Sequence, residues 1–313
     1  MKDFVKKVII FFLPLLILLI IGIIYLPQNN NDYLIKKHYL DEHSNDIETL
    51  ILGSSHTYYD INPEFLSSKS FNAAYVSQTI DIDAAILFKY THNWKHLKTI
   101  IIPIDYFTLF EQLGTSMESW RLKKYANYWG IEQKAMQSGC WHQIDVMFDI
   151  YKDRFRQIIT KQCDSVTCSS LGWGNIYKAA YKTDLVKDGK IAAERHLLSD
   201  STCFSNNCKL LNEIINFAKA NNSRILFLTT PAYKTYTSLL NSVQLNKTIS
   251  TIKTIVASED NCIYINYLTD RDFLETDFHD SDHLNEIGAK KFSNKIDAVL
   301  TKPDLKPIFL NYK

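Results

Sequence analysis

Short apolar runs alternate with amphipathic segments along most of this 313-residue chain. Mostly apolar runs predict buried strands at residues 49–52, 98–104, 224–228 and 262–265. The shorter segment at residues 70–72 predicts a fifth strand. Apolar residues at helical spacing predict helices at residues 81–90, from 209 onward, 237–256 and 284–300. Buried strands that alternate with helices are typical of a parallel sheet covered on both faces. We therefore expect a flavodoxin-like α/β three-layer sandwich with strand order 2-1-3-4-5.

The alternation is interrupted at residues 106–208, where aromatic side chains are frequent. We expect an inserted, mainly helical subdomain here, between the two halves of the α/β domain at residues 31–105 and 209–313. The core of such a subdomain explains the aromatic residues. The alternative is a platform on which sugar rings stack. Residues 31–45 are polar and predict a short connection.

The first thirty residues predict a membrane anchor. Residues 8–26 form an uncharged apolar run of 19 residues, which as a helix is about 28 Å long and can cross a bilayer. Lys2, Lys6 and Lys7 precede it and few cations follow, so we expect a cytoplasmic N-terminus and an extracytoplasmic remainder. A cleaved signal peptide is the alternative, but the run lacks a small-x-small cleavage site. We expect one uncleaved transmembrane helix in the cell membrane.

Charge and cysteine content limit the partners and the compartment. Lys and Arg number 35 against 34 Asp and Glu, so nothing indicates nucleic-acid binding. All six cysteines follow the anchor, and Cys163/Cys168 share their spacing with Cys203/Cys208. Outside the cell, two short disulfide-closed loops are expected, with reduced or buried thiols as the alternative. The spacing does not favour a zinc site.

Two segments carry candidate chemistry. A serine pair, Ser54 and Ser55, follows the first predicted strand, and an acid lies three residues before His283 just ahead of the last predicted helix. Both segments fall at the carboxyl ends of strands, where open α/β sheets bind ligands. A serine hydroxyl needs a positioned imidazole, and the imidazole needs an acid, to become a nucleophile. Ser54 competes with Ser55 for this role, and Asp282 competes with Asp280.

Other roles for the same residues stay open. Ser281 or Asp282 could cap the last helix. A metal site is a further alternative, with ligands drawn from His279, Asp280, Asp282 and His283. Because no companion ligands are recognisable near Ser55, we expect neither a metal nor a cofactor. Tyr233 and Lys234 follow the fourth predicted strand and either line the site or are ordinary loop residues.

The motifs resemble the SGNH (GDSL-like) hydrolase superfamily. The resemblance rests on Gly53-Ser54-Ser55, on Asn72-Ala73-Ala74 and on Asp280-x-x-His283, within the specific string Asp-Ser-Asp-His-Leu-Asn-x-x-Gly-Ala. It covers residues 49–105 and 209–300. The chain is most similar to membrane-anchored, envelope-facing members, such as the D-alanine transfer protein of teichoic acid modification and polysaccharide O-acetylation proteins.

The resemblance implies roles for five residues. Ser55 would be the nucleophile, His283 the general base and Asp280 the residue that orients the base. The oxyanion would be bound by the Ser55 N–H and by the N–H of Ala74, where the family has glycine. The family's third donor is an asparagine after the third strand, but Asp105 stands there. Losing such a donor costs about 10²–10³ in rate, which favours slow acyl transfer over rapid hydrolysis.

These features predict a membrane-anchored serine esterase or O-acyltransferase. Its substrate would be an acyl ester, O-acetyl foremost, on a cell-envelope glycan. A chain with one span cannot carry an activated acyl group across the membrane, so transfer would require a separate multi-spanning acyltransferase as partner. The alternative is a catalytically degenerate accessory or glycan-binding subunit, which the Asp105 replacement favours.

Overall fold

The computed structural model describes residues 2–25, 31–131, 166–198, 202–302 and 309–311. The chain divides into two units, Met1–Asn31 with Glu132–Val166, and Asp32–Ile131 with Thr167–Lys313. In the first unit the described element is helix α1 (Lys2–Tyr25). Within the described ranges no helix is long and apolar enough to span a membrane. Of the expected anchor, residue 26 and the side chains of residues 15 and 18–25 lie outside the description.

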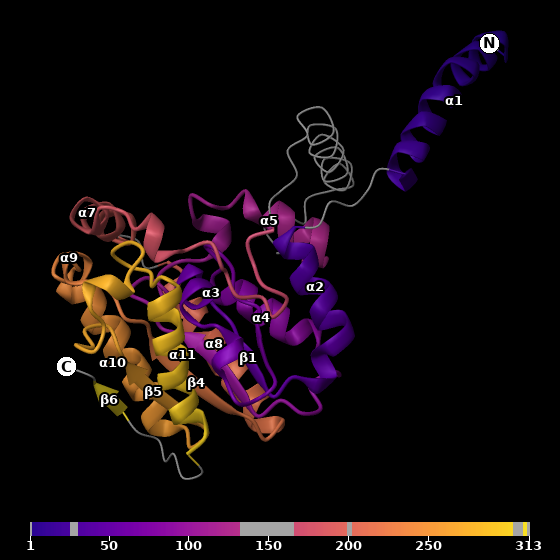
Figure 1. The fold of residues 1–313 in the computed structure, drawn as a ribbon. Helices are drawn as coiled ribbons and strands as arrows, with labels where there is room; N and C mark the ends of the chain where they lie inside the picture. Colours follow the sequence, from indigo (N-terminus) through magenta and orange to yellow (C-terminus); the bar gives the residue numbers. More distant parts are fainter. Residues whose placement is uncertain (1, 26–30, 132–165, 199–201, 303–308, 312–313) are drawn as a thin grey trace. The chain divides into compact units, whose positions relative to one another are not determined.

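The second unit is built on a parallel sheet whose described strands follow the order β2-β1-β3-β4-β5-β6 (Figure 1). These strands are β1 (Thr49–Ile51), β2 (Ser70–Asn72), β3 (Thr99–Pro103), β4 (Arg224–Thr229), β5 (Cys262–Asn266) and β6 (Phe309–Asn311). The α/β class, the five expected strands and their order 2-1-3-4-5 are confirmed. Strand β6, parallel to β5 at the edge, was not expected.

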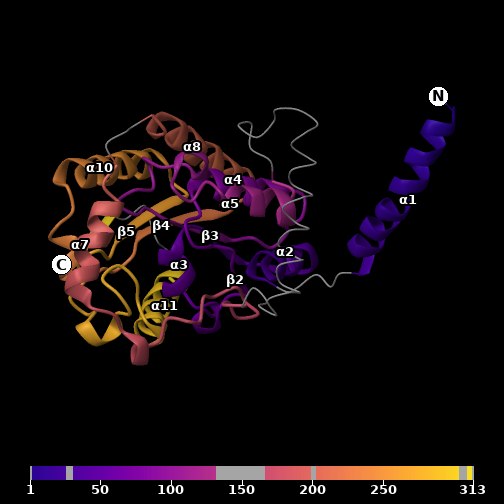
Figure 2. The same cartoon turned by 90° about the horizontal axis from the view of Figure 1, so that it is seen from above.

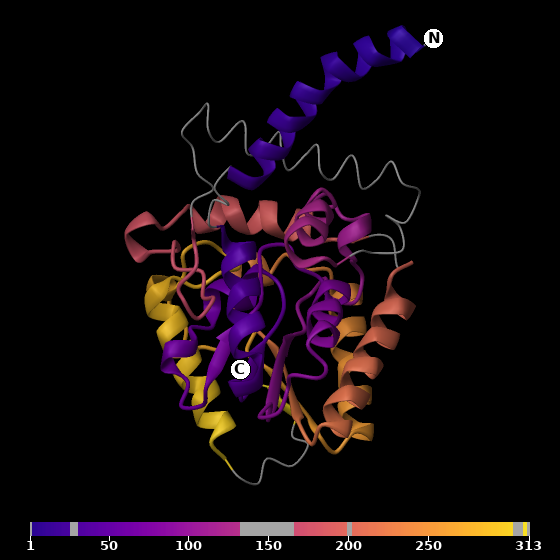
Figure 3. The same ribbon diagram turned by 90° about the vertical axis from the view of Figure 1, so that its right-hand side faces the viewer.

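Helices cover both faces of this sheet (Figures 2 and 3). The described α-helices are α2 (Asp32–His43), α3 (Ser55–Asp60), α4 (Ile80–Lys89), α5 (Arg121–Lys124), α7 (Leu185–Arg195), α8 (Phe204–Ala220), α9 (Lys234–Thr237), α10 (Ser242–Ser258) and α11 (Glu286–Leu300). Helices α4, α8 and α10 lie on one face, and α3 and α11 on the other. Strands β1 and β3 are buried along their whole length, which explains why they are nearly all apolar.

Helix α2 replaces the polar connection expected at residues 31–45. Its buried positions include the polar Asp32 and Lys36, so its inner face has no apolar stripe that the sequence could reveal. The Lys36 ammonium donates to the backbone carbonyls of Asn72 (2.8 Å), Ala74 (2.6 Å) and Gly172 (2.6 Å). These bonds fasten α2 to the turn after β2.

Residues 106–131, 167–198 and 202–208 of the expected insertion fall in the same unit as the sheet. Asp32 of α2 accepts the N–H of Thr167 at 2.8 Å, and Gly172 lies so close to Asn72 that a Cβ there would be 2.1 Å from its carbonyl oxygen. These contacts pack residues 167–172 against α2 and the end of β2. Residues 132–165 lie outside the description.

The expected Cys203–Cys208 disulfide is wrong, since both thiols are free. Cys203 directly precedes α8 and Cys208 lies within it. Residues five apart on a helix point about 140° away from each other, which keeps the two sulfurs apart. Cys168 is a buried free thiol, and its expected partner Cys163 lies outside the described residues.

Candidate active site

A tight turn after β1 sets the position of the two serines. Gly53 has φ +115°, a conformation that side chains rarely adopt, and a Cβ there would lie 2.1 Å from Pro103 Cγ. The Thr57 hydroxyl donates to the Leu52 carbonyl at 2.7 Å and braces the turn from inside α3. The sequence therefore needs glycine here to pass from a buried strand directly into a helix.

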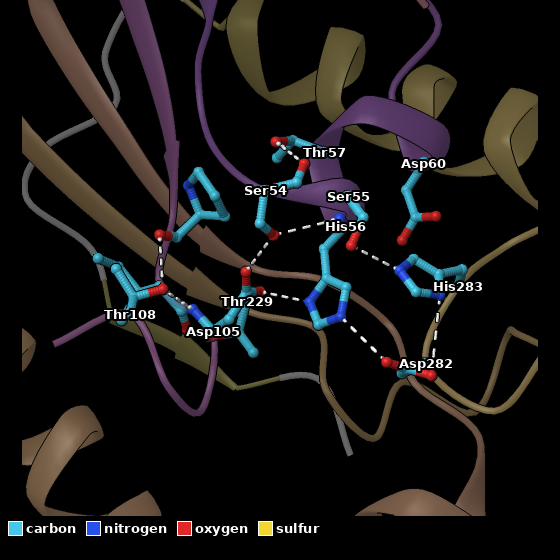
Figure 4. Close-up of polar contacts among 12 residues, drawn as sticks. Ser54, Ser55, His56, Thr57, Asp60, Asp105, Thr108, Thr229, Asp282 and His283 are labelled. Carbon is cyan, nitrogen blue, oxygen red and sulfur yellow. Dashed lines mark hydrogen bonds and ion pairs between the residues drawn. The ribbon is translucent and has the colours of Figure 1, made fainter. Parts of the chain in front are cut away.

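The structure assigns different partners to the two serines (Figure 4). Ser54 precedes α3, and its Oγ accepts the His56 N–H at 3.2 Å and donates to Asp105 Oδ2 at 2.9 Å. Ser55 is the first residue of α3, and its Oγ lies 2.8 Å from His283 Nε2. Ser55 is thus the serine in hydrogen-bond contact with the histidine, and Ser54 is a capping residue.

The loop before α11 holds His283 against Asp280. His283 Nδ1 lies 2.9 and 3.0 Å from the two carboxylate oxygens of Asp280. Asp280 Oδ1 also accepts the backbone N–H groups of Asp282 (3.1 Å) and His283 (2.8 Å), which fixes the carboxylate. The cap of α11 is Asn285, whose side chain accepts two helical N–H groups, so neither Ser281 nor Asp282 has that role.

The electrostatics of His283 suit a proton acceptor. Burial lowers the pKa of His283, but the carboxylates of Asp280 and Asp282 outweigh burial and raise it above its usual value. A carboxylate at Nδ1 requires the ring to carry its proton there, which leaves Nε2 free to accept the Ser55 proton. The arrangement is therefore that of a serine with its base and an orienting acid.

Asp60 connects the helix that begins at Ser55 with the loop that carries His283. This fully buried carboxyl ends α3, and its Oδ1 accepts the N–H of Leu284, the residue after His283, at 2.8 Å. Burial raises the pKa of Asp60 to about 8, against the opposing effect of the nearby histidines. Ser55 begins the same short helix, so the Asp60 bond ties the serine and the histidine loop together.

A cavity of about 250 Å³ opens beside Ser55 and His283. Ser77 lies in its wall with φ +58°, an unusual value for a residue other than glycine. The Tyr75 N–H donates to the Gly53 carbonyl at 3.0 Å and holds this loop beside the serine turn. The lining residues are Ser54, Ser55, Tyr59, Val76, Ser77, Gln78, Thr79, Phe107, Glu111, Ser116, Met117, Glu118, Arg121, Tyr177, Arg195, His196 and His283.

Ala74 and Asp105 lie where the sequence places them but do not face this cavity. The Ala74 N–H donates to Asn72 Oδ1 at 3.1 Å, and Ala74 is fully buried. Asp105 is also buried, with Oδ2 bound by Ser54 and Oδ1 2.9 Å from His56 Nδ1. Neither residue is among those that line the cavity in the described part of the chain.

The residues offered as metal ligands have other partners. His279 stacks on Tyr177, with ring centroids 3.9 Å apart, rather than joining the other candidates. The group whose atoms come together is His56, Asp282 and His283, within 4.8 Å of one another. Because His283 Nδ1 is bound to Asp280 and the Arg195 guanidinium is 3.3 Å from Asp282, this group does not fit a divalent cation.

Sequence reasoning missed most of the cavity wall. Phe107, Tyr177 and Arg195 come from the region treated as an insertion, and no local pattern marks them as neighbours of Ser55. Tyr233, which was considered for the site, instead donates its hydroxyl to Glu275 at 3.0 Å. Neither it nor Lys234, which lies over its ring, is among the described cavity-lining residues.

The chain was compared with family models, curated proteins and solved structures. No family model matches the chain, and no curated protein matches it. Among solved structures, it is similar to a protein from Bacteroides fragilis provisionally described as an acylhydrolase. The TM-score is 0.41 and the identity 10%, over 84% of this chain and 93% of that chain. A likeness at this level carries no argument for function.

Proposed function

We propose that this chain is a serine esterase or O-acyltransferase of the SGNH type, with Ser55 as nucleophile. The observation that carries the proposal is the contact between Ser55 Oγ and His283 Nε2 at 2.8 Å, with Asp280 on the other ring nitrogen. The three groups come from two segments 225 residues apart, since 280 minus 55 is 225. They meet beside a cavity, as a reacting group requires.

The reaction would proceed in two stages, acylation of Ser55 and then its deacylation, with His283 transferring the proton in each. Ser55 Oγ attacks the ester carbonyl while its proton moves to His283 Nε2, and Asp280 stabilises the resulting imidazolium. His283 then gives this proton to the departing alcohol oxygen, and the acyl group remains on Ser55. Water or a sugar hydroxyl next attacks the acyl-serine, loses its proton to His283, and releases the acid or the new ester as Ser55 recovers its proton.

The oxyanion would be stabilised by the Ser55 N–H and by the loop that lines the cavity after β2. Ser55 is the first residue of α3, where N–H groups have no acceptor within the helix. In the second position we favour the loop around Ser77 over Ala74, because Ser77 lines the cavity and the Ala74 N–H is bound to Asn72. The carboxylate of Asp105 is bound by Ser54 and His56, which lessens its repulsion of an oxyanion.

The substrate we propose is an acyl ester on a cell-envelope glycan, with acetyl as the first group to test. Ser77, Glu111 and Arg121 in the cavity wall support a sugar, because their polar groups can form hydrogen bonds with sugar hydroxyls. The uncharged run at residues 8–26, preceded by three lysines, supports a single-pass anchor with the site outside the cell. Transfer in that position would draw its acyl group from a multi-spanning acyltransferase.

A second candidate function is an accessory subunit without turnover. The specific observation in its favour is that two of the three oxyanion donors suggested by the resemblance are missing, since Asp105 replaces an asparagine and the Ala74 N–H is occupied. Removing one donor alone slows such enzymes by about 10²–10³. In that case the cavity would bind a glycan for a partner enzyme.

Turnover of a chromogenic acetyl ester and labelling by a fluorophosphonate separate the two functions. We expect Ser55→Ala and His283→Ala each to reduce turnover by about 10⁴ or more and by similar factors, because the residues act as a unit. Ser54→Ala is the matched control and should still be labelled. Full turnover or labelling in Ser55→Ala would refute the proposed nucleophile. A folded wild-type protein with neither activity would favour the accessory subunit.

A further inference from the structure

His56, the residue after the proposed nucleophile, is a buried histidine that the reaction above does not use. Its Nδ1 lies 2.9 Å from Asp105 Oδ1, and its Nε2 lies 3.5 Å from Asp282 Oδ2 (Figure 4). The side chain is 5% exposed, and the two carboxylates are 1% and 3% exposed. One imidazole thus faces two buried acids, one on each nitrogen.

We propose that His56 is a positioning residue that remains protonated, lies between the carboxylates of Asp105 and Asp282, and holds the serine turn against the His283 loop. This inference rests on the proposed function and adds a residue to its machinery. Asp105 follows β3 and accepts the Ser54 hydroxyl, while Asp282 is the neighbour of His283. The charged ring therefore links all three segments that surround Ser55.

The two short distances favour a charge on the ring. A neutral imidazole has one N–H and could face only one carboxylate as a donor, whereas the imidazolium has two. An unpaired carboxylate in a buried position is very unfavourable, so both acids need a cation. Burial lowers the pKa of His56, but Asp105 and Asp282 outweigh it and raise the pKa well above its usual value. Burial raises the pKa of Asp282, but His283 and His56 outweigh burial and hold this pKa well below its usual range.

Other charged and titratable groups lie around the ring. The Arg195 guanidinium lies 3.3 Å from Asp282 Oδ2, and His196 Nδ1 lies 4.0 Å from it. Burial lowers the pKa of His196 well below its usual value, so this ring is neutral. Asp60 is neutral as well, because burial raises its pKa to about 8 and keeps the carboxyl protonated. Asp105 and Asp282 are thus matched by His56 and Arg195, while the Asp280 carboxylate is held by His283 and by two backbone N–H groups.

This charge also acts on the proposed base. The rings of His56 and His283 have centroids 4.9 Å apart, and a cation at that distance disfavours a second one. His56 therefore opposes protonation of His283, whose pKa Asp280 and Asp282 raise. The consequence is that His283 remains an unprotonated base to a lower pH than its two acidic neighbours alone would allow.

The test is a double-mutant cycle with His56→Gln and Asp105→Asn in the full chain in detergent micelles. His56→Gln should greatly lower the unfolding temperature, because it leaves Asp105 buried without a cation. Adding Asp105→Asn should restore a large part of that loss, so the two effects should be strongly non-additive. In the pH profile of kcat/KM, both variants that lack His56 should show the acidic limb raised by about one pH unit or more. Asp105→Asn alone should move it less.

The unfolding measurements do not depend on turnover, so they separate failure of this inference from failure of the proposed function. Additive unfolding effects, a stable His56→Gln, or an unmoved acidic limb would overturn the inference. If His56→Gln does not fold, nitrogen NMR of histidine rings in the wild type decides instead. One histidine should keep both ring protons at pH 7.5, and its signal should vanish in the double variant. Absence of such a ring would overturn the proposal.

Discussion

Asp60 offers a test of the structure that depends on proton binding alone. Its Oδ1 accepts the N–H of Leu284, and its carboxyl is fully buried. Asp60→Asn keeps the acceptor and the volume but cannot ionise. Burial raises the pKa of Asp60 from an ordinary 3.8 to about 8. Between these two values the folded protein holds a proton that the unfolded chain has released.

The sign and size of the effect follow from proton linkage. When the folded state binds one more proton, the free energy of unfolding falls by about 1.4 kcal/mol for each unit of rising pH. Across the window from about pH 4 to pH 8, Asp60 accounts for a loss of about 5 kcal/mol in the wild type. Asp60→Asn removes this loss, so its stability relative to the wild type should rise across the window.

Urea unfolding of both proteins at pH 5, 6, 7 and 8, followed by tryptophan fluorescence, measures the difference directly. Glu213→Gln is the control for a carboxylate-to-amide change, because this side chain lies on the exposed face of α8. Asp83, which is buried with a pKa of about 7, contributes equally to the wild type and both variants and cancels. Parallel pH dependences for the wild type and Asp60→Asn would refute the raised pKa.

Two further outcomes are expected. Gly53→Ala should destabilise the fold by several kcal/mol and abolish turnover, because its Cβ would overlap Pro103 at a φ of +115°; an unfolding midpoint within error of the wild type would contradict this account of the turn. Cys203 and Cys208 should each take up one alkylating group after denaturation without reductant; a mass two units lower with no uptake at either residue would mean that they form a disulfide.

The sheet was predictable because its central strands are short, nearly continuous apolar runs. Ile100, Ile101 and Ile102 are each fully buried, and such apolar runs have few alternatives to a central strand. The order of the five strands followed from the expected fold class. Helix α2 was missed because half of its buried positions are polar, with Asp32 and Lys36 bound to partners at least 26 residues away in sequence. No periodic pattern records such bonds.

The candidate site was predictable in part, where its residues lie close together in the sequence. Asp280 and His283 are local to one loop, so their spacing is visible in the sequence. The pairing of Asp105 with His56 is not, because it joins residues on different strand ends through burial and charge. From the sequence, Asp105 reads as a missing oxyanion donor. Its contacts with Ser54 and His56 instead make it part of the support behind the nucleophile.

The enclosure of Lys36 makes it a reporter of local opening. Lys36 is 2% exposed, and its ammonium is held by carbonyl oxygens of Asn72, Ala74 and Gly172. A reagent that acylates amines in water would modify surface lysines within minutes yet reach Lys36 only when one of these backbone segments lifts away. Mass spectrometry of the peptide that contains Lys36 would measure the extent of its acylation over time. This extent would therefore report how often the backbone around Asn72, Ala74 and Gly172 opens locally.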